Sequence, residues 1–259
     1  MTPKQRRATP LVFFATVLVA WEAGVHATGS AKIAPYPSGI AEAAVRALAD
    51  GTLLTAIAGS LQRVTTGFAI AALFGIPLGL LMGLAEPVRR ALDPIVDSLR
   101  AIAPIAWIPM ALLWLGIRGN AALFIVAYAA FFPFVLNTIQ AVRLIDRRLV
   151  DAGRALGAGR WLTLHAIIVP GALPVVLTGA RIAMAFAWGS IIAAEMAIGI
   201  KVNPGGAATV GLGQLMVNTL YIKRDINGLV LYMASIGLIS MAIDYGVRSL
   251  QRAVTPWQK

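Results

Sequence analysis

Few residues in this sequence could carry out chemistry. It has no cysteine and only two histidines, His26 and His165, which excludes disulfides, thiol catalysis, iron–sulfur ligation and a histidine-rich metal site. Neither a His-Glu-x-x-His zinc motif nor a glycine-flanked serine nucleophile occurs. None of the lysines follows a glycine, so the Gly-Lys-Ser/Thr of a phosphate-binding loop is missing. We therefore expect a protein that is not an enzyme, has no catalytic residues and itself binds no metal or cofactor.

Charged side chains inside long apolar runs are the remaining candidates, because a charge within lipid is costly and marks a functional site by default. Asp97 precedes Arg100 by three residues and can neutralise it on one helical face. Arg181 has no such local partner, since Glu195 lies about 21 Å further along the same helix at helical rise. Another helix, a second subunit or an anionic solute must therefore satisfy Arg181. For Glu195 we favour a gate or a contact between helices, because a carboxylate repels an anion.

Long apolar segments must position these side chains. The chain has 259 residues, 59% of them hydrophobic and 13% charged, which is more apolar than a soluble domain needs. A helix crosses the hydrocarbon core of a bilayer with about 20 apolar residues. The sequence predicts an all-α, polytopic protein in membrane lipid, with a single transmembrane domain, 1–259. Its six predicted spans are about 11–27, 60–84, 95–117, 121–142, 171–197 and 227–249. The first resembles a signal peptide, but we expect it to be retained.

Lysine and arginine concentrate in the loops on one side of these spans, including the loop 143–170. The positive-inside rule makes that side cytoplasmic, and six spans place both termini there. This topology explains the formal net charge of +11, so we expect no nucleic-acid partner. On the opposite side, the loop 28–59 has a turn cluster followed by a short interfacial helix predicted over 40–54.

Small residues recur every four positions in the second predicted span. They are Gly67, Ala71, Gly75, Gly79 and Gly83. This spacing predicts a helix face that another helix approaches closely, which is architecture rather than chemistry.

The third predicted span contains two prolines, Pro104 and Pro109, each of which removes an intrahelical hydrogen-bond donor. We expect a kinked or broken helix there. Broken helices at membrane depth occur where the backbone faces protein or a water-filled cavity, so this segment is a candidate for the translocation pathway. Trp107 and Trp114 are seven residues apart and either narrow that pathway or pack against a neighbouring helix. The candidates for the translocation pathway are therefore Arg100, Pro104, Trp107, Pro109, Trp114, Arg181 and Glu195.

The cytoplasmic loop 143–170 is polar and basic, yet its pattern is helical. It predicts a short cationic helix that Asp151 begins and Gly157 ends. Small side chains leave its surface open to close approach, and Leu156 and Trp161 can serve as apolar anchors. Such a helix docks into a groove of a partner. The predicted docking residues are Asp151, Ala152, Gly153, Arg154, Ala155, Leu156 and Gly157.

The same loop resembles the coupling-loop signature of ABC-importer permeases. Its spacing is Asp151-Ala152-Gly153, three residues, Gly157, nine residues, Ile167, one residue and Val169-Pro170. The family pattern has Glu-Ala-Ala at the start and Leu-Pro at the end, so this chain differs by Asp for Glu, Gly for the second Ala and Val for Leu. The segment Pro104 to Pro109 and the triplet ending at Glu195 resemble the taurine, aliphatic sulfonate and nitrate branch of these permeases.

That resemblance implies the type I importer permease fold in the bacterial inner membrane. It implies a homodimer, two separate ATPase subunits that bind ATP and Mg²⁺, and a periplasmic substrate-binding protein. The solute would cross by alternating access, with taurine as the first choice and an alkanesulfonate or nitrate next. The alternative is a proton-coupled secondary carrier with a relay through Glu22, His26, Glu195 and Asp244. Such a carrier would leave the spacing of the coupling loop unexplained.

Overall fold

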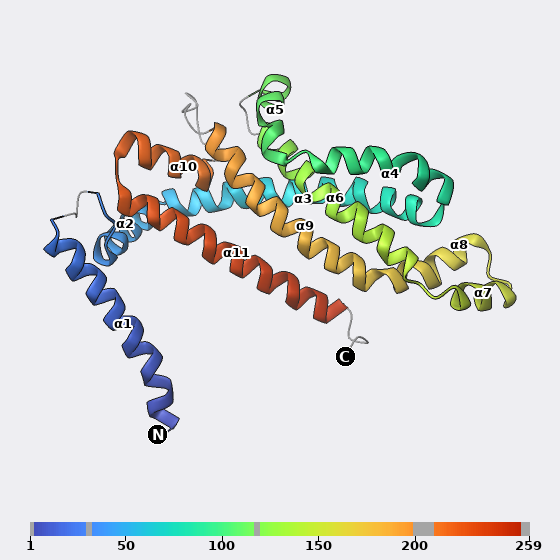
Figure 1. The fold of residues 1–259 in the computed structure, drawn as a ribbon, viewed down its shortest axis with the longest axis horizontal. Helices are drawn as coiled ribbons and strands as arrows, with labels where there is room; N and C mark the ends of the chain where they lie inside the picture. The colour runs from blue at the N-terminus through green and yellow to red at the C-terminus, as the bar shows by residue number, and fades with distance from the viewer. Residues whose placement is uncertain (1–2, 30–32, 117–119, 199–209, 255–259) are drawn as a thin grey trace. The chain divides into compact units, whose positions relative to one another are not determined.

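The computed structural model describes residues 3–29, 33–116, 120–198 and 210–254, and within these ranges the regular secondary structure is helical, with no strand (Figure 1). The α-helices are α1 Pro3–Ala27, α2 Pro37–Ala49, α3 Thr52–Leu84, α4 Glu86–Ala101, α5 Ile108–Leu115, α6 Asn120–Arg143, α7 Arg147–Ala155, α8 Arg160–Thr163, α9 Val169–Ile198, α10 Leu212–Asn218 and α11 Ile226–Val254. Three short segments join them: the 3₁₀ helix η2 Pro104–Trp107 and the π-helical turns η3 Leu164–Ile168 and η4 Thr219–Lys223.

Four helical runs in the described residues are long and apolar enough to cross a membrane: Thr52–Leu84, Asn120–Arg143, Arg160–Ile198 and Ile226–Ala253. A fifth candidate consists of α4 followed by the segment Pro104–Leu115, which is bent from it by 84°. The all-α membrane fold is confirmed, whereas the count of six spans is not reproduced in full. The first predicted span, 11–27, falls in α1, where part of the side chains lie outside the described residues.

Contacts divide the chain into two compact units, 1–59 with 199–238 and 60–198 with 239–259. In the first unit, the carboxylate of Glu22 on α1 accepts hydrogen bonds from the backbone and hydroxyl of Ser38 at the start of α2. A carboxylate at a helix N-terminus is stabilised by the free N–H groups and by the helix dipole. His26 packs edge-on against Tyr36, and its Nδ1 lies 3.1 Å from the backbone oxygen of Glu22, not from the carboxylate.

The helix predicted in the loop 28–59 is present but displaced, and its interfacial position stays a prediction. The structure has α2 over Pro37–Ala49, whereas we predicted 40–54. Gly51 has a φ of +67°, a left-handed conformation that glycine adopts without strain, and it ends α2 before α3 begins. The last residues of the predicted range therefore belong to the first membrane-crossing run.

In the second unit, the glycine face of α3 packs on α6, as its spacing predicts. A Cβ added at Gly67 would lie 2.6 Å from Val126 Cγ1, and one added at Gly79 would lie 2.6 Å from Thr138 Cβ. These separations are far shorter than van der Waals contact, so the backbones approach more closely than any side chain permits. A Cβ added at Gly75 or Gly83 would likewise lie too close to side chains of α6.

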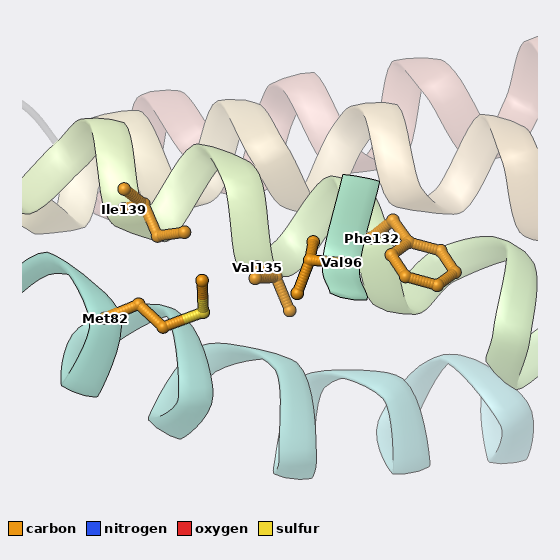
Figure 2. Packing of buried hydrophobic residues seen from close by; sticks show 5 residues of the cluster. All are labelled: Met82, Val96, Phe132, Val135 and Ile139. Atoms are coloured by element: carbon orange, nitrogen blue, oxygen red, sulfur yellow. The ribbon is translucent and has the colours of Figure 1, made fainter. Parts of the chain in front are cut away.

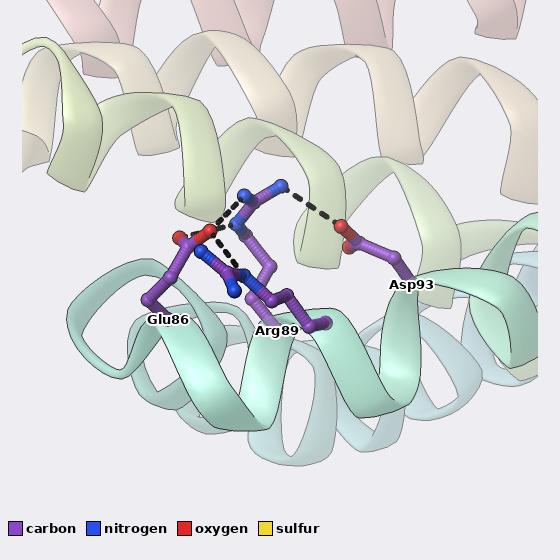
Figure 3. Close-up of polar contacts among 4 residues, drawn as sticks. Glu86, Arg89 and Asp93 are labelled. Atoms are coloured by element: carbon purple, nitrogen blue, oxygen red, sulfur yellow. Dashed lines mark hydrogen bonds and ion pairs between the residues drawn. The ribbon is translucent and has the colours of Figure 1, made fainter.

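A hydrophobic cluster completes this packing and holds α4 to the pair (Figure 2). Met82 comes from α3 and Val96 from α4, while α6 contributes the remaining members, Phe132, Val135 and Ile139. Val96 is the only buried residue described on α4, because that helix is strongly amphipathic. Its first turns carry an ion-pair network in which Arg89 contacts Glu86 at 2.6 Å and Asp93 at 2.9 Å (Figure 3).

Candidate functional site

The break in the third predicted span opens a cavity. The α-helix ends at Ala101, and Pro104 begins a 3₁₀ turn that leads into α5. Proline lacks the backbone N–H that a continuing helix would use, so the chain changes direction here. The predicted break is therefore confirmed. The cavity has a volume of about 280 Å³ and is lined by Arg100, Ile102, Pro104, Tyr128, Ala129, Phe132, Pro133, Leu136, Asn137, Ile182 and Phe186.

An aromatic cluster borders this break. The ring centroid of Trp107 lies 6.3 Å from that of Trp114 and 5.5 Å from that of Tyr128 on α6. Trp107 thus packs against a neighbouring helix, one of the two predicted roles, while Trp114 is 59% exposed. Pro109, at the start of α5, is exposed. Of these predicted residues, Arg100 and Pro104 line the cavity. Trp107, Trp114 and Pro109 do not.

Arg100 forms the expected pair on its own helix, with its Nε 2.8 Å from Asp97 Oδ1. Both side chains are about half exposed, at 50% and 59%. The contact engages Nε of the Arg100 guanidinium. The two terminal nitrogens of the guanidinium can therefore contact a ligand.

Arg181 is paired with a different helix. Its Nε lies 2.6 Å from Asp244 Oδ1 on α11, and Arg248 contacts the other oxygen of the same carboxylate at 2.8 Å. This is the inter-helix partner that the sequence required without naming it. These three side chains link α9 to the part of α11 that belongs to the second unit. Asp244 is therefore the structural partner of Arg181.

Glu195 is fully buried and belongs to a network between α3 and α9. The hydroxyl of Ser60 donates to both of its carboxylate oxygens, at 2.9 and 2.8 Å, and Arg63 Nη1 donates at 2.8 Å. Arg63 is itself only 14% exposed. The geometry matches the inter-helix contact that we favoured for Glu195. The role of Arg63 was missed, although its spacing of three from Ser60 places both on one helical face.

The coupling loop holds a nine-residue helix, α7, whose start differs from the prediction. Asp146 is the N-cap, and its carboxylate accepts from the backbone N–H of Arg148 at 2.9 Å. Asp151 lies in the middle of α7 and is exposed, so its predicted capping role is wrong. The earlier cap allows a longer helix with more hydrogen bonds. The predicted end is confirmed, because Gly157 has a φ of +88° and its N–H bonds to Arg154 O.

Gly153, which departs from the family pattern, packs against Ile167. A Cβ at Gly153 would lie 2.5 Å from Ile167 Cδ1, another residue of the signature. Because Cδ1 is the far end of a flexible side chain, alanine can also occupy this position while α7 lies on η3. The side chains of Leu156 and Trp161 face outward, with exposed fractions of 89% and 73%. The motif thus contains a part that packs the loop on itself and a part that is free to meet a partner.

Several helices long enough to cross a membrane, with a bent segment beside them, are typical of membrane transport proteins. The chain belongs to the family described as "Binding-protein-dependent transport system inner membrane component", which it matches over residues 75–259. The resemblance to ABC-importer permeases is therefore confirmed, and the chain is an integral inner-membrane permease.

Several curated proteins are similar over most of the chain. The taurine transport system permease protein TauC of Escherichia coli (strain K12) is 36% identical over 210 residues, which cover 80% of this chain and 72% of that protein. A probable ABC transporter permease of Brucella abortus (strain 2308) is 34% identical over 96% of this chain and 95% of its own length. The bicarbonate transport system permease protein CmpB of Synechocystis sp. is 34% identical over 77% of this chain and 68% of that protein.

Solved structures agree on the fold. An inward-facing structure of the MetNI methionine ABC transporter aligns with a TM-score of 0.66 at 20% identity, covering 78% of this chain and 96% of that chain. An amino acid ABC transporter solved with histidines aligns with a TM-score of 0.61 at 14% identity, over 80% of this chain and 97% of that chain. At these identities the likeness establishes the fold alone.

Proposed function

We propose that this chain imports a small anionic solute, with taurine as the first choice and an alkanesulfonate or nitrate next, as the permease subunit of an ATP-driven transporter. Family membership over 75–259 and the similarity to a taurine permease support this choice most directly. The similarity to bicarbonate permeases makes bicarbonate a necessary competitor in any test.

The working assembly is a homodimer in membrane lipid with two ATPase subunits and a periplasmic substrate-binding protein. Both termini and the loop 143–170 face the cytoplasm. The ATPase subunits dock on α7 through its exposed surface, in particular Leu156, which projects from the end of the helix. ATP and Mg²⁺ bind to those subunits, and this chain carries no catalytic residue. Closure of the ATPase pair moves α7 and exchanges inward-facing for outward-facing states.

The test is uptake by proteoliposomes that contain this chain, its ATPase and its binding protein. Labelled taurine is the probe, with ethanesulfonate, nitrate and bicarbonate as competitors. We expect saturable uptake that ATP drives, with ethanesulfonate competing better than nitrate. If labelled nitrate or bicarbonate is taken up and taurine neither enters nor competes, the chain is still an importer permease but the proposed solute is wrong.

A further inference from the structure

The cavity at the broken span has one strongly polar end. Among the residues that line it, Arg100 is the only one with a full charge at neutral pH. A volume of about 280 Å³ is at the small end of ligand cavities, so the space suits a compact solute rather than a drug-sized one. All of its walls belong to the second unit.

The guanidinium at this end retains donors for a ligand. It has five N–H groups, and within the described part of the chain its ion pair uses Nε toward Asp97. The two terminal nitrogens can make parallel hydrogen bonds to two oxygens of one oxyanion, the geometry that arginine forms with sulfonate-like and carboxylate groups. Asp97 competes with a ligand for the same charge, since its Oδ1 lies 2.8 Å from Nε.

Most of the remaining lining of the cavity is apolar, and Asn137 and Tyr128 are its other polar residues. Phe132 is a member of the buried cluster of Figure 2, and Phe186 contributes a further aromatic wall from α9. The Tyr128 hydroxyl donates to the carbonyl oxygen of Leu99 in the last turn of α4, which fixes its ring beside the break. A bare inorganic oxyanion would leave these walls without a partner, whereas a solute with a short hydrocarbon body would cover them.

We propose that this cavity is a binding subsite for a small organic oxyanion, with the anionic group on Arg100 and a short apolar body against Phe132 and Phe186. The inference rests on the proposed function and deepens it, since it separates organic sulfonates and carboxylates from nitrate and bicarbonate. Asp97 pairs with Arg100 when the subsite is empty and gives it up to the ligand.

Direct binding to the full-length chain in lipid nanodiscs tests this subsite. Saturation-transfer NMR titrations with taurine and ethanesulfonate give the affinity without the binding protein or the ATPase. Arg100→Gln is expected to weaken binding about 10- to 100-fold, the loss of a charge-assisted contact. Asp97→Asn removes the competing carboxylate and is expected to tighten binding. Phe186→Ala is expected to weaken the organic anions severalfold and leave nitrate unchanged.

The control is Arg90→Gln on the same helix, because Arg90 is 77% exposed and does not line the cavity. Melting midpoints establish that each variant folds. Opposite shifts for Arg100→Gln and Asp97→Asn support the subsite, whereas equal losses in both would show that the pair is structural and would overturn it. Wild-type affinity in Arg100→Gln would also overturn it. If the wild-type assembly takes up no organic anion, the proposed function fails instead, and uptake of such an anion with no Arg100 effect refutes the subsite alone.

Discussion

Replacing Glu195 with glutamine should destabilise the protein more than any exposed substitution. The carboxylate is fully buried, and it faces Arg63, whose side chain is 14% exposed, at 2.8 Å. Glutamine preserves the shape and can still accept from Ser60, but it removes the negative charge that faces the part-buried Arg63 guanidinium. Breaking one side of a buried pair costs about 3–5 kcal/mol. For a chain of this size, that corresponds to a fall in the unfolding midpoint of about 6–20 °C.

A double-mutant cycle separates this pair from its surroundings. Arg63→Met combined with Glu195→Met removes both charges and should recover much of the stability that either single change loses. Thermal unfolding in detergent, followed by tryptophan fluorescence, measures each variant, and Arg90→Gln serves as the exposed control. If Glu195→Gln melts within 1 °C of wild type while uptake falls, the residue acts on the solute and our structural interpretation is wrong.

Three further predictions concern packing and docking. Gly79→Ala should destabilise by about 1–3 kcal/mol because its Cβ would lie 2.6 Å from Thr138, whereas Gly189→Ala has nothing within 4 Å and should be neutral or stabilising by up to about 1 kcal/mol; unfolding midpoints compare the two. Leu156→Asp should abolish co-purification with the ATPase and leave the midpoint unchanged, since the side chain is 89% exposed; retained co-purification would contradict docking at α7. Asn227→Ala should lower the midpoint, because its Oδ1 accepts from Tyr36 N at 3.1 Å; an unchanged midpoint would count against that contact.

Features that depend on short stretches of sequence could be predicted. The apolar runs identify helices because a helix satisfies its own backbone hydrogen bonds in lipid and needs about 20 apolar residues to cross it. The prolines of the third span predict its break, and the glycine repeat predicts the packing face of α3. Each of these signals lies within a few turns of one helix. The predicted N-cap of α7 was wrong because Asp146 and Asp151 can each begin a helix here. The sequence does not show which of the two gives the longer helix.

Features that join distant parts of the chain could not be predicted. Arg63 and Glu195 are 132 residues apart, and Arg181 and Asp244 are 63 apart. A single sequence indicates that such charges need partners but not which partners they have. The cavity at Arg100 was also hidden, because its walls come from α6 and α9 as well as from the broken span.

The energy source of transport tests the central claim most directly. Proteoliposomes with the complete assembly would be given ATP on the ATPase side or, separately, an imposed proton gradient without ATP, and uptake of labelled taurine would be followed in each. We predict uptake with ATP, none with the gradient alone, and loss of the ATP-driven uptake in Leu156→Asp. Uptake that follows the proton gradient and persists without the ATPase would contradict the account.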